Sequence, residues 1–234
     1  MLQKIVEKDP KVRYAAEEIC SKDFEQLCVD QFASRVIQSL IEMYENFRIF
    51  ATDYFRQHVW KCIESMPAVY LLVAVIRLRK DDLEIDFVRK MIEDDYTQAI
   101  GSKHIKRVVV SYLIKVNEKS LPELFLLFKL RKKVNLVKLF NDKFMPYVFM
   151  TFVCKEFRPA IEMLTCYIEH NFRQLLKTKH FMFILMKVVT IGTFEDKTHE
   201  HNSLALDLLI SAVCKFSASD LRNQRFSYLC KTIS

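Results

Sequence analysis

The chain has 234 residues, 51% of them hydrophobic, which is enough to bury a large core in one domain or two. Only two glycines occur, where average usage of about 7% would give roughly sixteen, so glycine-rich phosphate loops and tight hairpins are not expected in number. The formal net charge is +7, and the longest apolar runs, 68–76 and 144–154, fall well short of the ~20 residues of a membrane span. These runs predict buried helices instead.

The seven cysteines are spread along the chain without a CxxC pair, so neither a disulfide framework nor a zinc site is expected. We interpret them as small core residues in a reducing compartment. The first residues, MLQKIVEKDPK, contain no apolar segment of a secretory signal. We therefore expect a nuclear, nucleolar or cytoplasmic protein that is neither secreted nor membrane-bound. No motif for phosphate-loop, serine-hydrolase or zinc-protease chemistry occurs, so we expect no enzyme, no metal and no cofactor.

Apolar residues recur at helical spacing along most of the chain. The first clear stripe lies in 32–41, where apolar residues occur at i, i+4, i+5, i+8 and i+9. Similar stripes follow at 87–92, 105–113, 121–130, 145–154, 161–168, 181–189 and 204–216. The prolines lie near the starts of several of these segments, where the first helical turn tolerates them. Residues 192–203 are the clearest loop, and no linker rich in proline, glycine or serine divides the chain.

A weak internal repeat runs through these segments. Aligning the segments that start near Asp30, Ser65, Ser102, Asn141 and Lys177 gives spacings close to 36 residues. Such a period is typical of stacked helical repeats, in which each unit buries its apolar face against its neighbours. We expect one all-α domain over 1–234, with five or six units and inner helices near 30–42, 66–79, 102–115, 142–155 and 178–190.

Positive charge is concentrated in the middle of the chain. Between residues 101 and 140 there are ten Lys or Arg and two Glu, a net charge of +8, which leaves −1 for the rest. A concentrated basic segment on a nearly neutral protein is typical of a site for a polyanion, with RNA as the leading candidate. A solvated helix face is the alternative explanation.

The run from Asp30 to Gln38, DQFASRVIQ, resembles one repeat of the pumilio (PUF) family. The resemblance implies a right-handed α-solenoid in which Ser34 and Gln38 contact the edge of one RNA base and Arg35 stacks on it. The geometry is consistent with this role, because residues i and i+4 lie on one helix face and a planar guanidinium can stack on a base. A Ser-Arg-Gln set resembles the adenine-reading type.

The other repeats match in spacing and apolar pattern only. Residues able to stack recur at the second motif position, whereas the edge-reading positions are mostly apolar, as with Val69 and Val73. Stacking combined with positive charge binds single strands with little sequence preference. The residues expected to bind RNA are Ser34, Arg35, Gln38, Tyr70, Lys103, Lys106, Arg107, Arg131, Lys132, Lys133, Tyr147 and Phe183. Tyr70, Tyr147 and Phe183 are alternatively core aromatics at helical spacing.

Degenerate repeats of this kind resemble the pumilio-like proteins of ribosome assembly, which implies binding to precursor ribosomal RNA and a part in its processing. We expect the chain to be a monomer. Control of mRNA through 3′-untranslated regions is one alternative. A HEAT- or armadillo-like scaffold that binds a protein is an alternative of another class, and a protein partner on the convex face is compatible with all three. Lys106, Arg107 and Arg35 on one continuous face would favour RNA over the scaffold.

Overall fold

The computed structural model describes residues 10–79, 85–96, 104–128, 130, 135–178, 180, 181, 184 and 214. The described elements are α-helices and one short 3-10 helix, with no strand among them, so the predicted all-α class is confirmed. The chain divides into two compact units, Met1–Asn117 and Glu118–Ser234. The predicted single-domain organisation stays a prediction. In the described part of the chain, no helix is both long enough and apolar enough to cross a membrane.

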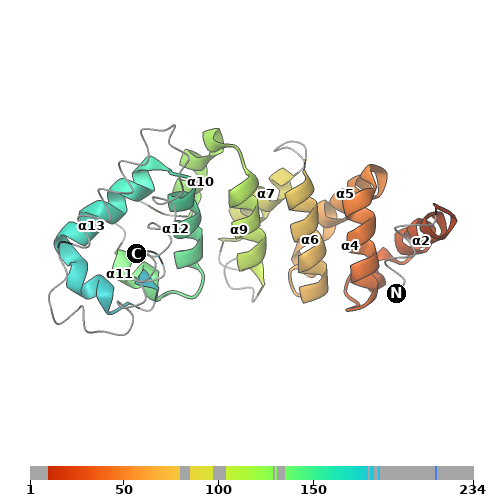
Figure 1. Cartoon of the computed structure of the whole chain (residues 1–234), viewed down its shortest axis with the longest axis horizontal. Coiled ribbons are helices and arrows are strands. Elements are labelled where there is room, and N and C mark those ends of the chain that lie inside the picture. The colour runs from red at the N-terminus through yellow and green to blue at the C-terminus, as the bar shows by residue number, and fades with distance from the viewer. Residues whose placement is uncertain are drawn as a thin grey trace. The chain divides into compact units, whose positions relative to one another are not determined.

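The first unit is built around a row of three helices that lie side by side, α4 (Ala33–Met43), α6 (Met66–Leu78) and α9 (Ile105–Lys115). Helix α6 packs against both of its neighbours in the row. Two further helices, α5 (Glu45–Cys62) and α7 (Asp86–Asp94), lie behind the row in Figure 1. Helix α5 contacts α4 and α6, and α7 contacts α9, so these two helices cover one side of the row. Among the described helices, none lies in front of the other side in Figure 1, which we call the open side.

The same order of helices recurs in both units: a short helix, an inner helix and an outer helix. In the first unit these are α3 (Phe24–Leu27), α4 and α5, preceded by α2 (Pro10–Lys22). Helix α5 contains one residue with non-helical dihedral angles, His58 (φ −124°, ψ 22°), so its last turn forms the short helix before α6. The residues of α5 before His58 therefore form the outer helix of one repeat, and those after it form the short helix of the next.

The second unit repeats this order with α11 (Leu136–Asn141), α12 (Met145–Cys154) and α13 (Arg158–Leu176), which pack on one another. The 3-10 helix η2 (Glu118–Ser120) and helix α10 (Leu121–Leu127) precede them. Helix α13 also contains a non-helical residue, Asn171 (φ −131°, ψ 21°), near its C-terminal end. The inner helices α4, α6, α9 and α12 therefore lie near four of the five expected inner-helix positions, and the fifth, 178–190, lies mostly outside the described residues.

Local sequence signals explain where the inner helices begin. An aspartate before α4 and another before α12 each accept two backbone hydrogen bonds: Asp30 from Phe32 and Ala33 (2.9 and 2.7 Å), and Asp142 from the amides of residues 144 and 145 (2.6 and 2.9 Å). These bonds satisfy amides that the helix itself leaves unpaired. Helices α6, α10, α12 and α13 each have a proline in the first turn, as predicted.

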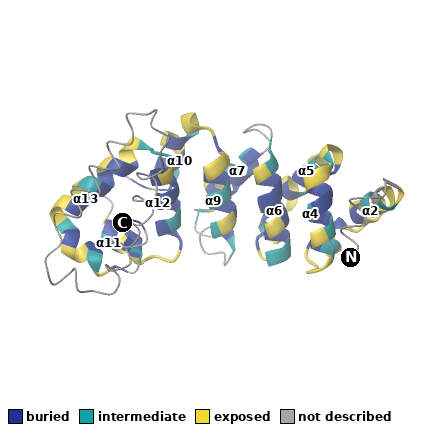
Figure 2. Cartoon of the chain, viewed as in Figure 1, coloured by how far each residue is buried: buried dark blue, intermediate teal, exposed yellow. Residues whose placement is uncertain are grey.

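The core of the first unit is rich in aromatic rings where α3 meets α5. Phe24 is 2% exposed and its ring lies 4.8 to 6.1 Å from four other rings, those of Phe47, Phe50, Tyr54 and Phe55. Burial of one such side chain stabilises the fold by about 1.5–3 kcal/mol. In α6, eight residues are buried, which confirms the buried helix predicted for the run 68–76. Figure 2 shows these buried turns along the row.

The described cysteines are free thiols, and they differ in exposure. Cys20, Cys28 and Cys62 are buried as predicted, whereas Cys154, Cys166 and Cys214 are exposed, so the prediction of core positions is wrong for these three. Cys154 is the last residue of α12, and Cys166 is not among the buried residues of α13.

Candidate nucleic-acid interface

Each inner helix of the first unit carries a stripe of three residues whose first and last members are exposed and lie seven apart, or two helical turns. On α6 the exposed residues are Tyr70 and Arg77, and every residue between them is buried. Because α4 and α9 flank α6 and α5 covers it from behind, this stripe lies on the open side of the row. We call these stripes the open stripes; they comprise Arg35, Gln38 and Glu42 on α4, Tyr70, Val73 and Arg77 on α6, and Arg107, Val110 and Ile114 on α9.

The first residues of two neighbouring open stripes are in direct contact. The guanidinium carbon of Arg107 lies 5.1 Å from the centre of the Tyr70 ring, and both side chains are exposed. This distance is typical of a cation–π pair between an arginine and an aromatic face. Tyr70 is 46% exposed, so it is not the core aromatic that the alternative interpretation of the sequence expected. Two groups that can stack on a base therefore lie together on adjacent inner helices.

Helix α4 presents the third residue of this kind, Arg35, which is exposed at the start of its open stripe. Gln38 is half-buried, and its amide nitrogen donates to a carboxylate oxygen of Glu42 at 2.7 Å. Ser34 lies differently from its expected role: it is 7% exposed and its hydroxyl donates to the backbone carbonyl of Gln31 at 3.2 Å. The base-contacting role of Ser34 stays a prediction and would require this hydroxyl to change partner.

The apolar residues expected at edge-reading positions of α6 and α9 are largely closed to solvent. Val69 is 0% exposed and Val73, the second residue of the α6 stripe, is 8% exposed, while Val110 on α9 is half-buried. These side chains offer no hydrogen-bonding atom to a base edge. The prediction that base-specific contacts are few after the first repeat therefore has a structural basis in the buried face of α6.

In the second unit, α12 carries the same spacing, with Tyr147 half-buried and Cys154 exposed seven residues later. The Tyr147 ring lies 5.8 Å from the ring of His180. Met150, which lies between Tyr147 and Cys154 on α12, is 4% exposed. Tyr147 thus has a ring neighbour and a partly exposed face.

The basic residues predicted from the sequence fall into two groups. Lys106 is half-buried next to the exposed Arg107 on α9. Lys103, Arg131, Lys132, Lys133 and the aromatic Phe183 lie outside the described residues. Arg107 lies beside Tyr70, and Arg35 is exposed on α4. The expectation that Lys106, Arg107 and Arg35 share one continuous face stays a prediction.

The third residue of each open stripe was not foreseen from the sequence. Arg77 adds a positive charge to α6, Glu42 adds a negative charge to α4, and Ile114 is 57% exposed on α9. A signal for them exists, since each lies seven residues after a predicted stacking residue. Two pockets, of about 280 and 330 Å³, are lined by none of the predicted RNA-binding residues.

Comparison with known proteins bears on the fold. No protein-family sequence model matches the chain, and no curated protein matches it in sequence. Solved structures of PUF domains do match it in three dimensions. The Puf3 RNA-binding domain bound to a Cox17 RNA 3′ UTR recognition sequence matches with a TM-score of 0.78 at 13% sequence identity, covering 99% of this chain and 66% of the Puf3 chain.

Two further structures agree. PUF-8 in complex with PBE-RNA matches with a TM-score of 0.65 at 12% identity, covering 99% of this chain and 77% of that one. PUF-6 in complex with 5BE13 RNA matches with a TM-score of 0.66 at 14% identity, covering 92% and 61%. At such identities the matches show the fold: the chain has the PUF-repeat fold, as the resemblance of residues 30–38 predicted. It spans just under two thirds of the length of the Puf3 domain.

Proposed function

We propose that the chain binds single-stranded RNA on the open stripes of α4, α6 and α9. Bases stack on Arg35, Tyr70 and Arg107, and the arginines also neutralise phosphates. The observation that carries this proposal is the contact between Arg107 and Tyr70, because it brings two base-stacking groups of successive repeats together on the uncovered side of the row. The Puf3 and PUF-8 domains, which have the same fold, are bound to RNA, which supports RNA as the ligand of this chain.

The proposed recognition has little sequence preference. Stacking is tolerant of sequence because every base has a π-face. On the open stripes of α6 and α9 the second residue is a valine, whereas α4 has Gln38. Base reading is therefore confined to the first repeat in this unit. The remaining predicted contacts of the RNA are Ser34, Lys103, Lys106, Arg131, Lys132, Lys133, Tyr147 and Phe183.

The setting that we propose is ribosome assembly, with binding to precursor ribosomal RNA, and mRNA control is the second candidate. A preference for stacking over base reading favours the first, because structured precursors are not selected by a short base code. RNA crosslinked to the protein in cells and then sequenced separates the two. Enrichment of ribosomal precursor segments supports ribosome assembly, and enrichment of mRNA 3′ ends contradicts it.

The test of RNA binding uses the double variant Arg35→Ala/Arg107→Ala and a labelled pool of random single-stranded RNA over a series of salt concentrations. Each phosphate contact on a single strand contributes about 0.7 to the slope of log K against log salt concentration. We expect the double variant to bind more weakly and to lower this slope by about 1.4.

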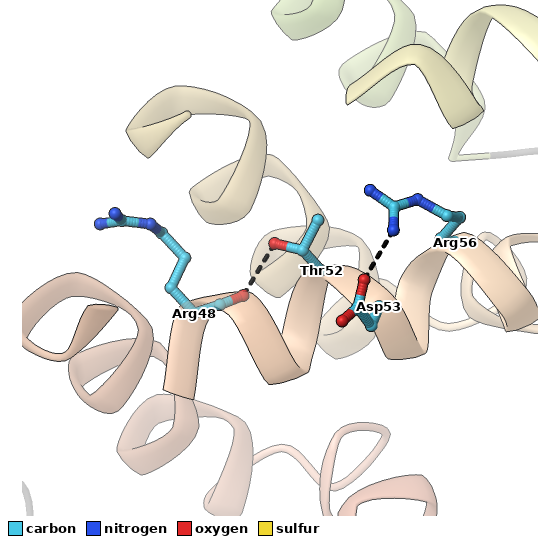
Figure 3. Close-up of polar contacts among 4 residues, drawn as sticks. All are labelled: Arg48, Thr52, Asp53 and Arg56. Carbon is cyan, nitrogen blue, oxygen red and sulfur yellow. Dashed lines mark hydrogen bonds and ion pairs between the residues drawn. The ribbon is translucent and has the colours of Figure 1, made fainter. Parts of the chain in front are cut away.

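A matched control lies on α5, which covers the other side of the row. The double variant Arg48→Ala/Arg56→Ala removes the same charge (Figure 3). Arg56 is exposed and pairs with Asp53 at 2.6 Å, and the hydroxyl of Thr52 donates to the backbone carbonyl of Arg48, which the substitution retains. We expect RNA affinity close to that of the wild type. Equal effects of the two double variants would contradict the proposed face, and absence of RNA binding at low salt would favour the protein scaffold.

A further inference from the structure

A hollow lies between α2 and the N-terminal half of α5, at the end of the row of inner helices (Figure 1). Its volume is about 330 Å³, and its lining includes three aromatic rings and two carboxylates, those of Tyr14, Phe47, Phe50, Glu17 and Glu18. None of the residues of the open stripes is part of this lining. The proposed RNA binding therefore gives this part of the surface no role.

The aromatic side of the hollow is held in place by the core of the first unit. Phe47 is 3% exposed, and the ring of Phe50 lies 5.8 Å from its ring and 5.3 Å from the ring of Phe24. Tyr14 lies on α2 and is 71% exposed, so most of its ring is open to solvent. The face of an aromatic ring carries partial negative charge and attracts cations.

The two carboxylates of the hollow differ in their partners. Glu18 forms an ion pair with Lys22 at 2.7 Å, one turn further along α2. Glu17 is half-buried, and within the residues that the structure describes it forms no ion pair. A half-buried carboxylate beside aromatic faces attracts a cation and repels the phosphates of RNA, and both effects strengthen where water is displaced. The hollow therefore prefers the opposite charge to the one that the open stripes prefer.

Size and shape favour a guanidinium among the cations. A cavity of about 150 Å³ holds a benzene molecule, and sites for drug-sized ligands have about 300–1,000 Å³. A hollow of about 330 Å³ thus suits one long side chain better than a large cofactor. A guanidinium is planar, stacks on aromatic faces and donates two parallel hydrogen bonds to one carboxylate, whereas an ammonium is a strongly hydrated point charge.

We propose that the hollow between α2 and α5 binds an arginine side chain of a partner protein, with the guanidinium stacked on Tyr14 and paired with Glu17. The partner is a protein with an exposed arginine-rich segment. Ser21 and Asn46, which also line the hollow and are exposed, supply a hydroxyl and an amide for the backbone of that segment. Arginine and tyrosine are enriched among the residues that anchor protein interfaces. The hollow gives the chain a protein-binding surface that does not depend on RNA binding.

The test uses a fluorescent peptide of alternating glycine and arginine, together with two matched peptides in which lysine or the neutral isostere citrulline replaces every arginine. Fluorescence anisotropy measures their binding to the chain purified free of RNA. We expect the arginine peptide to bind several-fold more tightly than the lysine peptide, because only the guanidinium both stacks and pairs in a planar fork. The citrulline peptide should not bind, since it has no charge.

Substitutions on α2 identify the site. Tyr14→Leu keeps an apolar side chain without a π-face and should weaken binding of the arginine peptide by about two- to fivefold, as the loss of one exposed cation–π contact implies. Glu17→Gln should weaken it by a similar factor, because the charge that pairs with the guanidinium is removed. The double variant Tyr14→Leu/Glu17→Gln should bind single-stranded RNA as the wild type does.

The matched control is Glu64→Gln, which removes the same charge from a position just after the end of α5. Glu64 is exposed and does not line the hollow. We expect the affinity for the arginine peptide to stay within about twofold of the wild type, because salt screens exposed charges that lie apart.

The outcomes are distinct. Weaker binding of the arginine peptide by Tyr14→Leu and by Glu17→Gln, with Glu64→Gln unchanged, supports the inference. Equal affinity for the arginine and lysine peptides, equal effects of Glu17→Gln and Glu64→Gln, or a wild-type chain that does not bind the arginine peptide overturns it. RNA binding is measured separately on the same variants, so the failure of this inference is distinguishable from the failure of the proposed function.

Discussion

Removal of the Tyr70 ring is the sharpest test of base stacking on the row of inner helices. Stacking of one base on an aromatic ring contributes about 1–3 kcal/mol to binding. In the free protein the ring is already covered in part by Arg107 at 5.1 Å, and an exposed cation–π contact of this kind is worth about 0.5–1 kcal/mol. The incoming base displaces that contact, so the net loss in Tyr70→Ala is about 1.3 kcal/mol, or roughly tenfold in affinity.

The assay is fluorescence anisotropy with a labelled single-stranded RNA pool, and the chain offers its own control. Tyr14 is 71% exposed on α2, away from the open stripes, so Tyr14→Ala removes the same side chain without a stacking site. Tyr70→Phe keeps the ring and should bind within about twofold of the wild type, since a phenyl ring stacks similarly. Because Tyr70 is exposed, its truncation should lower the free energy of unfolding by no more than about 1 kcal/mol. Binding by Tyr70→Ala within twofold of the wild type would refute stacking at this position.

Three further predictions concern stability. Phe149→Ala should lower the free energy of unfolding by about 3–5 kcal/mol in urea titrations, because the ring is 0% exposed; a loss below about 1 kcal/mol would contradict this packing. Asp30→Ala should lower the free energy of unfolding, because two backbone amides at the start of α4 lose their acceptor. The two amide donors lower the pKa of Asp30 from its usual 3.8. The contribution of Asp30 to the free energy of unfolding is therefore complete above pH 3.8 and is lost as the pH falls through the lowered pKa. Acid unfolding of the wild type and of Asp30→Ala would show this difference. Burial raises the pKa of Cys28 to about 11 and that of Cys62 to about 12, from 9.0. The contribution of these two buried thiols to the free energy of unfolding is therefore complete below pH 9 and is lost as the pH rises through 11 to 12. The urea midpoint of the wild type should fall more steeply above pH 9 than that of Cys28→Ala/Cys62→Ala, and equal pH dependence would contradict the assignment.

The inner helices were predictable because their cause is local. Apolar periodicity, a proline in the first turn and an aspartate before the helix all act within a few residues of the chain, and the sequence contains each of them. The division into two compact units at Asn117 was not predicted, since no change in composition marks it. It follows from which helices pack on which, and this information is distributed over the whole chain.

The candidate interface shows a similar limit. The position of Arg35 followed from its resemblance to a PUF repeat, and Tyr70 and Arg107 followed from the repeat spacing. Whether Tyr70 lies in the core or on the surface depends on the packing of α4 and α9 around α6, which a single stripe of sequence does not reveal. The partner of Gln38 was missed for another reason: Glu42 lies beyond the five-residue motif, one turn further along the same helix.

The non-helical residue His58 has a consequence for engineering repeats in this protein. The boundary between two repeats falls inside α5, so a repeat cut there would lose backbone hydrogen bonds on both sides of the cut. The joint at Ser65, which precedes α6 in an extended conformation (φ −110°, ψ 125°), interrupts no helix. Repeats exchanged between proteins of this architecture should therefore be joined before the inner helix, because a junction there leaves the helices on both sides intact.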